Sequence, residues 1–594
     1  MFLLTQPRKK KNTVYKYYSV ARSYREGKKV HIEILYRLGK LTDEEAAQMR
    51  AILKLQRGKG SYLTSLEEII FSEHWQYLDS ATLNHQWEAW ELSRCFGPKT
   101  KGSPVSTGDI AKILTFNRCL SPGSKAYASR WVRKTTLNHI IDIDYDKVND
   151  DKIYHELPKI ESCKGHVERH LFKKIKKDKP ESLDIVFYDL TSSYFEGTNC
   201  SLGRPGRTKN CGFKSHTIVL SLIVTKDGLP FSWEVLAGDT PEVSTIEKKV
   251  ADCKSRFGID TINLVFDRGL VSEDNLNLIE KAGYHYTSAL DKDQIPSIPG
   301  FDLTPFTGDD PHEVIVKIKA ASFKEYDDTL YFKESIADKR YIIGFNPTLF
   351  KDERKAREKR MEKLVTFVRE KNEALLKAKK SINEKALYRT IDTKMKGLRR
   401  LYSFNVEPKI ITVVKDPSKG ITKKVRSFEI TLIPKTETIE RAKLLDGFCA
   451  FITNNKEKKG DLYRYPAQRV IRSYRDKDKV ERAFRNIKSF IDLNPIYVFK
   501  EEHVRAHYTI CVLAYLLNIT ITNQVKVSNT TSLRSSSSIY EELSGGIVGE
   551  FKATSHTKGV KKLKSPTPLQ KKILSALDCE YLIDLKYIKK LLAA

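Results

Sequence analysis

LDIVFYDLT, residues 183–191, decides the fold that this sequence predicts. Apolar side chains dominate the run, and Asp189 follows where the expected strand ends. INLVFDRG, residues 262–269, repeats the arrangement with Asp267. A carboxylate at the end of a buried strand is held rigidly at a sheet edge, as a metal site requires. Either aspartate alone is equally consistent with a helix N-cap or a turn residue.

The segments around these two strands supply the rest of a sheet. Two further strand patterns, HTIVLSLIVT (216–225) and FSWEVLAG (231–238), lie between them, followed by a helical pattern over 241–257. A helical pattern over 272–283 and a short apolar run over 285–290 follow the second aspartate. This order of strands and helices predicts a mixed α/β sheet, and it is the order that a ribonuclease-H-like core gives.

A third carboxylate, Glu481, is the only glutamate in the basic stretch SYRDKDKVERAFRNIKSF, residues 473–490. On one continuous helix its face is shared by residues spaced three or four apart, because seven residues return almost to the starting angle: Tyr474, Lys477, Arg485 and Lys488. Ordinary ion pairs from Glu481 to Lys477 and Arg485 explain the same spacing. With both aspartates, however, Glu481 completes an oxygen ligand set that can hold two Mg²⁺ ions about 4 Å apart, an arrangement suited to phosphodiester displacement.

The spacing around Glu481 resembles a known signature. Y-(2)-K-(3)-E-(6)-K is similar, with one change, to the Y-(2)-R-(3)-E-(6)-K signature of cut-and-paste DDE transposases in the insertion-sequence-four superfamily. YDLTS and FDRG resemble the two aspartate motifs of that superfamily, and the resemblance covers roughly residues 180–520. The departure is Lys477, which stands where the family has arginine and lacks the bidentate guanidinium fork. Arg472 or Arg475 could replace that fork, and the sequence leaves both open.

The resemblance implies a DNA transposase acting by two-metal-ion hydrolysis and transesterification. Its catalytic and metal-binding residues would be Asp189, Asp267 and Glu481, with two Mg²⁺ or Mn²⁺ ions as cofactors. Residues that contact DNA would be Tyr474, Lys477, Arg485, Lys488 and Arg268. The resemblance further implies end nicking, a hairpin intermediate, and 3′-OH strand transfer of an insertion sequence into target DNA. Its partners would be double-stranded DNA, as terminal inverted repeats and target, and a second copy in a synaptic homodimer.

Two rival functions keep parts of this interpretation. One is a metal-dependent DNA nuclease or resolvase without strand transfer, and the other is a non-catalytic DNA-binding repressor. A serine or tyrosine recombinase is disfavoured, because Ser192, Ser193 and Tyr474 lack the arginine and histidine residues that such covalent chemistry needs.

Composition supports a nucleic-acid partner. Lys and Arg number 105 against 75 acidic residues, a formal net charge of +30, although a lysine-rich proteome gives the same bias. Nine cysteines without a C-x-x-C pair indicate reduced thiols, and Cys200, Cys211 and His216 lack zinc-ligand spacing. The apolar run 508–517 is shorter than the roughly 20 residues of a membrane span. We therefore expect a cytoplasmic, nucleoid-associated prokaryotic protein that does not use a membrane.

The predicted fold class is α/β, with a ribonuclease-H-like mixed-sheet catalytic core interrupted by an α+β insertion. An α/β N-terminal DNA-binding region and a helical C-terminus flank it. The expected parts are a β-hairpin and helix unit (1–80), a helical end-binding domain (81–175), the first core part (180–295), the insertion (296–460), the second core part with the glutamate helix (461–523), and a linker with a helical tail (524–594). Helical patterns around SPGS, residues 121–124, fit either a DNA-reading helix-turn-helix or an ordinary helix pair. GRPGRTKNCGFKS, residues 203–215, is expected to be a basic loop between strands.

Overall fold

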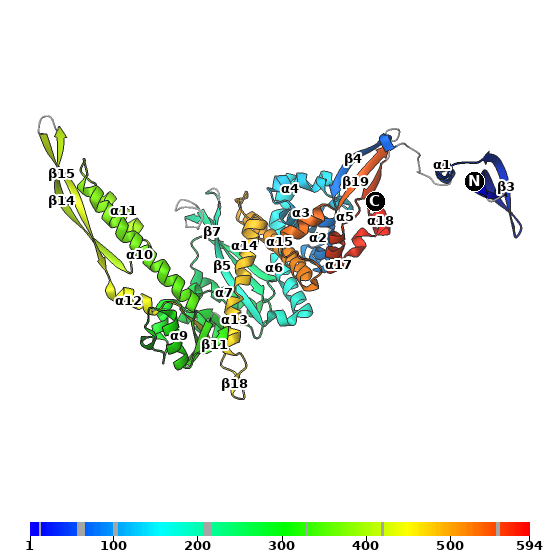
Figure 1. Cartoon of the computed structure of the whole chain (residues 1–594). Coiled ribbons are helices and arrows are strands. Elements are labelled where there is room, and N and C mark those ends of the chain that lie inside the picture. Colours follow the sequence, from blue (N-terminus) through cyan, green and yellow to red (C-terminus); the bar gives the residue numbers. More distant parts are fainter. Residues whose placement is uncertain are drawn as a thin grey trace. The chain divides into compact units, whose positions relative to one another are not determined.

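The computed structural model divides the chain into two compact units (Figure 1). The first contains residues 1–81, 134–140 and 541–594, and the second contains 82–133 and 141–540. The structure describes residues 1–10, 13–55, 66–98, 105–195, 198–205, 216–327, 330–416, 421–553 and 559–593. Most of the basic loop 203–215, including Cys211, lies outside the described residues.

The chain begins with a three-stranded antiparallel sheet followed by a helix. The β-hairpin and helix expected within residues 1–80 are present as β2 with β3 and as α1, which begins at Asp43. The additional strand β1 pairs with β2 along its whole length. Sequence patterning misses β1 because Pro7 and the basic residues after it are untypical of a strand. The strand can still form, because β1 lies at the edge of the sheet, where proline is tolerated. The elements are β1 (Phe2–Lys10), β2 (Thr13–Glu26), β3 (Lys29–Gly39) and α1 (Asp43–Leu55).

A second small sheet in the first unit joins the two ends of the chain. β4 (Ile69–Gln76) pairs antiparallel with β19 (Ile547–Ala553), which pairs with β20 (Val560–Leu563). The expectation of a helical C-terminus is therefore wrong for this stretch, although α17 (Pro568–Ala576) and α18 (Leu585–Ala593) are helical. The error has a physical cause, since the partner of β19 comes from the far end of the chain.

The sheet of the second unit places the strands that carry both aspartates side by side. Its strand order includes β8-β7-β5-β9-β10, in which β5, β9 and β10 are parallel and β7 is antiparallel to its neighbours. Helices α7 (Thr245–Ser255) and α8 (Glu273–Lys281) connect the later strands. The sequence pattern thus correctly predicts a mixed sheet. The strands are β5 (Ile185–Phe195), β7 (His216–Thr225), β8 (Pro230–Ala237), β9 (Asn263–Val265) and β10 (His285–Ala289).

The same sheet continues through strands that the sequence assigns to the insertion. β16 pairs with β10, and β13, β12 and β11 follow in antiparallel order, giving a ten-stranded sheet in the described part of the chain. Part of the expected insertion therefore belongs to the main sheet, because β16 covers an edge that β10 would otherwise leave open. The added strands are β11 (Lys324–Asp327), β12 (Leu330–Ile336), β13 (Arg340–Phe345) and β16 (Phe448–Thr453).

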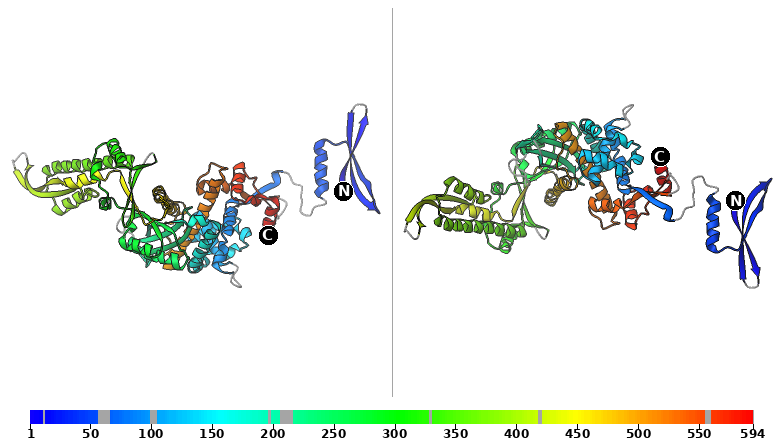
Figure 2. Two further views of the ribbon diagram at one scale, coloured as in Figure 1. Left: turned by 90° about the horizontal axis from the view of Figure 1, so that it is seen from below. Right: turned by 90° about the horizontal axis from the view of Figure 1, so that it is seen from above.

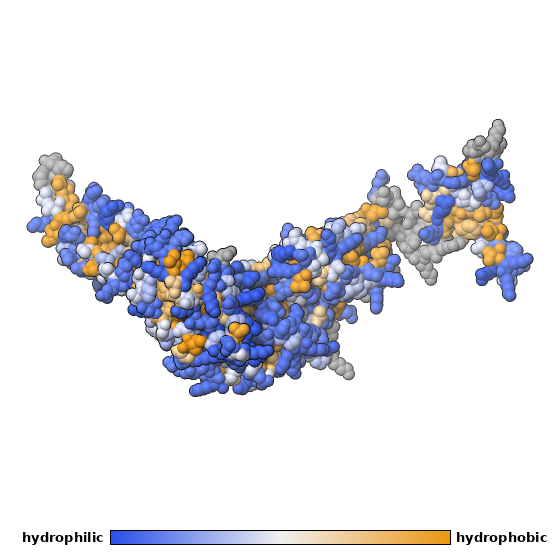
Figure 3. Space-filling view, turned by 60° about the horizontal axis from the view of Figure 1, so that its bottom comes forward, coloured by the Kyte–Doolittle hydropathy of each residue, from blue (hydrophilic) through white to orange (hydrophobic). Residues whose placement is uncertain are grey.

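The remaining insertion forms an arm with its own apolar core. Both views in Figure 2 show the β14–β15 hairpin alongside α10, and the exposed surface of the arm carries hydrophobic patches (Figure 3). Leu364, Val368 and Leu375 of α10 pack with Phe428 and Ile430 of β15. The arm consists of α10 (Pro347–Leu376), α11 (Glu384–Lys394), β14 (Tyr402–Asp416), β15 (Ile421–Pro434) and α12 (Thr436–Leu444).

A buried helix, α15 (Glu501–Ser528), packs against α3 (Thr107–Leu120), α6 (Asp150–Asp178) and β8. By length and composition α15 could cross a membrane, but 67% of its most apolar window is buried in the protein. The SPGS turn is followed by α4 (Lys125–Trp131). α3 is buried without interruption from Ile110 to Cys119, so it is unavailable as a DNA-reading helix. The second helix of the pair, α4, exposes only Arg130, which favours the ordinary helix pair, and the choice between the two alternatives stays a prediction.

Candidate active site

Neighbouring parallel strands bring the two aspartates together. Ile185 and Phe187 of β5 lie opposite Asn263 and Val265 of β9, and two residues further along each chain stand Asp189 and Asp267. Asp267 begins a short 3-10 turn, where its carboxylate accepts the Arg268 backbone N–H at 2.8 Å. Asp189 lies within β5, which continues to Phe195, so the expectation that it ends the strand is wrong.

Glu481 comes from a helix that packs on the same strands. α14 (Asp478–Arg485) contacts β5 and β7 and buries Val480, Ala483 and Phe484. The preceding helix, α13 (Ala467–Arg475), ends before it, so the predicted single helix is broken at residues 476–477. The break corrects the expected continuous stripe and places Lys477 at the N-cap of α14.

The ammonium of Lys477 lies between the carboxylates. Its Nζ donates to Oε1 of Glu481 at 2.7 Å and lies 3.8 Å from Oδ2 of Asp267. The Tyr474 hydroxyl donates to the other Asp267 oxygen at 3.3 Å. The Lys477 side chain is only 7% exposed, whereas those of Asp267 and Glu481 are 47% and 48% exposed. A buried cation thus holds two accessible carboxylates at one surface.

This surface is an open cavity of about 560 Å³. Tyr474 is fixed in its wall by its ring, which lies 5.3 Å from the ring of Phe451 on β16. The cavity therefore joins the main sheet to both helices, and its charged and hydroxyl-bearing lining includes Asp267, Arg268, Lys292, Glu353, Tyr474, Lys477 and Glu481.

Residues 4–63 match the family model of the IS1634 family transposase N-terminal domain. The match falls on the segment that begins with β1 and includes α1. It supports a DNA transposase, while the candidate site lies outside the matched residues. No curated protein matches the chain.

Solved structures of transposases align only loosely with this chain. A piggyBac transposase synaptic complex with hairpin DNA shares 10% identity, with a TM-score of 0.30, over 79% of this chain and 77% of that chain. A Mos1 transposase paired-end complex with left transposon end shares 12% identity, with a TM-score of 0.14, over 41% and 72%. The Mos1 strand transfer complex gives 12% identity and a TM-score of 0.15 over 43% and 75%. The functional argument therefore rests on the site itself.

Electrostatics couples Asp189 to the cavity. Burial raises the pKa of Asp189 to about 6, and the carboxylates of Asp267 and Glu481 raise it too, whereas Lys477 lowers it. Burial alone would lower the pKa of Lys477, but its Glu481 hydrogen bond and the charges of both aspartates raise it above its ordinary value. Lys477 is thus a cation paired with Asp267 and Glu481, and its charge also acts on Asp189.

The structure places the other residues predicted to contact DNA in different surroundings. Arg268 lines the cavity and pairs with Asp291 at 3.4 Å. Lys488 donates to Thr191 Oγ1 at 2.6 Å and to the Ser192 carbonyl at 2.7 Å. Within the described ranges, Arg485 has no acidic partner, so its expected ion pair with Glu481 does not form.

Two cavity residues were missed by sequence reasoning. Lys292 donates to Glu353 at 2.5 Å and to the Leu445 carbonyl at 3.2 Å. They come from a turn after β10 and from α10, and neither belongs to a recognisable motif. Only the packing of the arm against the sheet brings this pair to the cavity.

The donor atoms fit a hard divalent cation, with one condition. Among the residues that the structure describes, no group of three or more His, Cys, Asp or Glu side chains is arranged to hold a metal ion. The carboxylates of Asp267 and Glu481 instead share the ammonium of Lys477. Carboxylate oxygens are the ligands that Mg²⁺ prefers, so the residues fit this ion if the ammonium moves aside.

Replacing Lys477 tests this coupling. Lys477→Met should raise the pKa of Asp189 further, because Lys477 is the charged group that lowers it most. In metal-free protein, the stability gained by protonating Asp189 is present at low pH and lost as pH rises through about 6. In Lys477→Met this stability should be lost at a higher pH than in the native protein. The measurement is the free energy of unfolding by denaturant as a function of pH. Lys479→Met, which removes a lysine paired with Asp476, should leave the midpoint unchanged, and an equal shift in both variants would contradict the prediction.

Proposed function

We propose that this chain is a DNA transposase that cuts and joins phosphodiester bonds with Asp189, Asp267 and Glu481 at a metal-dependent site. The observation that carries the proposal is the meeting of Asp267 and Glu481 around Lys477 in an open cavity, with Asp189 on β5, the strand that pairs with β9. The family match at residues 4–63 supports the same class of protein. A ribonuclease-H-like core is part of the proposal, supported by the strand order β8-β7-β5-β9-β10 with β7 antiparallel.

Each residue has a distinct part in the proposed chemistry. Asp189, Asp267 and Glu481 would hold divalent ions, which supply Lewis-acid stabilisation of the attacking and leaving oxygens. Lys477 balances the carboxylates before DNA enters and can then turn its ammonium to a phosphate oxygen. Tyr474 orients Asp267 through its hydroxyl. Arg268, at 57% side-chain exposure, offers a further cation to the DNA backbone at the cavity edge.

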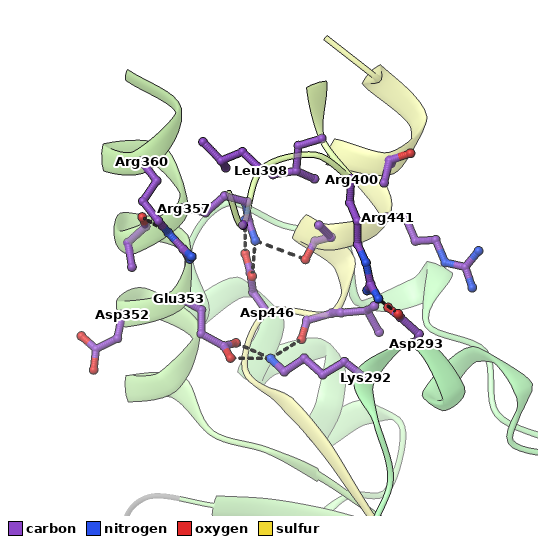
Figure 4. Close-up of a pocket in the computed structure, with 16 residues that line it drawn as sticks. Lys292, Asp293, Asp352, Glu353, Arg357, Arg360, Leu398, Arg400, Arg441 and Asp446 are labelled. Carbon is purple, nitrogen blue, oxygen red and sulfur yellow. Dashed lines mark hydrogen bonds and ion pairs between the residues drawn. The ribbon is translucent and has the colours of Figure 1, made fainter. Parts of the chain in front are cut away.

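A second pocket extends the cavity towards the arm. Its volume is about 480 Å³, and it shares Lys292 and Glu353 with the catalytic cavity. In Figure 4 Arg357 is tied to Asp446 and Arg400 to Asp293, whereas no dashed line joins Arg441 to another residue. In the described part of the chain, Arg441 has no acidic partner. We propose that this pocket holds DNA backbone leaving the active site.

Removing two exposed arginines tests the pocket. Arg400→Ala with Arg441→Ala should weaken DNA binding and make the slope of log K against log[salt] shallower by roughly 2, because each phosphate contact releases counterions. The measurement is a salt titration of binding by fluorescence anisotropy. Arg369→Ala with Arg389→Ala removes equal charge from exposed positions of the arm outside the pocket. Equal slopes in the two double variants would reject the pocket as a DNA path.

Joining distinguishes a transposase from a nuclease. The test combines the protein, Mg²⁺ or Mn²⁺, a pre-cut DNA end taken from the sequence flanking the gene, and a target plasmid. A transposase joins the end to the plasmid through the 3′-OH. Cutting without joining would favour a metal-dependent nuclease, and binding without either would favour a repressor.

A hairpin intermediate, a synaptic homodimer and action in the cytoplasm complete the proposal. Denaturing gels test for the hairpin intermediate, and cross-linking of the assembled ends tests for the homodimer.

A further inference from the structure

The N-terminal sheet has one face covered by α1. Arg50 of α1 donates to Thr5 Oγ1 at 3.4 Å and lies 5.8 Å from the ring of Tyr18. Lys16 pairs with Asp43 of α1 at 3.4 Å. Tyr18 is 2% exposed, so this face supplies the small core of the sheet.

The strand register assigns a different set of side chains to the other face. Residues that pair directly across strands share a face, and successive residues alternate between faces. Gln6 pairs with Tyr17, Arg8 with Tyr15, and Ser19 with Arg37. The open face is defined here by Gln6, Arg8, Tyr15, Tyr17 and Arg37, whereas Ser19 and Ala21, which share this side of β2 further from the β1–β2 turn, are buried.

Cations stack on the tyrosines of the open face. Lys40 Nζ lies 4.0 Å from the centre of the Tyr15 ring, and the Arg8 guanidinium lies 5.5 Å from that of Tyr17. Gln6, Arg8, Arg37 and Lys40 are exposed, and both tyrosines are half-buried. The apolar members of this face, Phe2, Leu4 and Ile34, are half-buried and lie further from the β1–β2 turn. The exposed end therefore combines positive charge, hydrogen-bond donors and flat aromatic surface.

This chemistry suits duplex DNA. The major groove is about 12 Å wide and admits a β-ribbon, whose strands lie about 4.8 Å apart. Arginine donates to guanine O6 and N7, and glutamine to adenine, so this face carries side chains able to distinguish bases. We propose that the open face of the β1–β3 sheet enters the major groove of the DNA end and selects its sequence. This inference rests on the proposed function, since it supplies that transposase with its end recognition.

The buried helix pair strengthens the assignment. α3 presents ten consecutive buried positions, from Ile110 to Cys119. Lys125, at the start of α4, is 4% exposed and hydrogen bonds His507 at 2.9 Å. A recognition helix must expose several polar residues to base edges, whereas in α4 only Arg130 is exposed. End recognition is therefore better placed on the N-terminal sheet.

Neighbouring residues on opposite faces give a matched test. The full-length chain is incubated with a duplex library of random sequence, and bound DNA is recovered and sequenced. The native protein should enrich a defined motif. Arg8→Gln with Arg37→Gln should lower the preference for that motif over scrambled duplex by roughly 10- to 100-fold. Lys9→Gln with Arg22→Gln removes two charges from the α1-covered face and should retain the preference.

Two readouts separate the outcomes. Dimethyl sulphate methylates guanine N7 in the major groove, and this modification should block binding of the native protein to its motif. Unchanged enrichment by the open-face variant, no interference from N7 methylation, or equal binding of single-stranded DNA would each overturn the inference. Thermal unfolding of both double variants checks that the sheet stays folded. A protein that selects a motif but does not cut DNA would overturn the proposed enzyme and leave this inference standing.

Discussion

Glu481→Gln should abolish metal-dependent cutting and joining while DNA-end binding persists. The substitution keeps the shape of the side chain but removes the charge that Lys477 and a divalent ion would share. Losing one ligand of a phosphodiester-cleaving metal site costs several kcal/mol of transition-state stabilisation, so we expect a fall of about 1,000-fold or more. The measurement is cleavage and strand transfer on labelled DNA that carries the flanking ends, in Mg²⁺ or Mn²⁺.

The control for this variant is Glu502→Gln, which alters an exposed glutamate in the first turn of α15. It should cut and join at the native rate. Retained end binding in Glu481→Gln, followed by anisotropy, separates a lost metal ligand from a misfolded protein. Native activity in Glu481→Gln would reduce Glu481 to an ion-pair partner of Lys477, and the catalytic assignment would fall.

Asp189→Asn should have opposite effects on activity and on stability. Activity should be lost because a neutral amide is a poor ligand for a divalent ion. The metal-free protein should become more stable at pH 7.5, because burial raises the pKa of Asp189 to about 6 and charging it costs free energy in the folded state. A shift of this size corresponds to a gain of about 1–3 kcal/mol in the free energy of unfolding.

The gain should disappear at low pH. At about pH 3, below the ordinary pKa of about 3.9 for an unfolded Asp, Asp189 is neutral in the folded protein and largely neutral in the unfolded chain, so native protein and variant should converge. Denaturant unfolding in the presence of a chelator at about pH 3 and pH 7.5 measures both limits. Asp260→Asn changes an exposed aspartate and should alter stability by less than about 0.5 kcal/mol at either pH. Destabilisation by Asp189→Asn at pH 7.5 would mean that the fold favours the charged carboxylate.

Local patterns in the sequence predict much of the fold around the candidate site. β5, which carries Asp189, and β9, which ends two residues before Asp267, form where apolar runs place them, and they are adjacent and parallel. The β14–β15 hairpin and the charged helix α10 also follow from patterning, because alternation and helical spacing report which side chains face a core. The roles of the three carboxylates in catalysis stay a prediction.

Other features depend on contacts that no local pattern reports. The C-terminal strand β19 pairs with β4, and β16 pairs with β10 although the whole arm lies between them in the sequence. A strand that satisfies its hydrogen bonds with a distant partner carries little sign of that partner in its own residues. The break between α13 and α14 is similar, since the spacing of Tyr474 to Lys488 fits one helix equally well.

The sequence by itself determined the residue types of the site, the two aspartate strands and the basic helix that carries Glu481. Only the tertiary structure decided that Lys477 lies between Glu481 and Asp267, that Lys292 and Glu353 join the cavity, and that α3 is buried. The physical reason is that local propensity acts over neighbouring residues, whereas burial and charge pairing act between side chains that folding brings together. Lys477 is buried, and the pKa of Asp189 is raised, only in the packed protein.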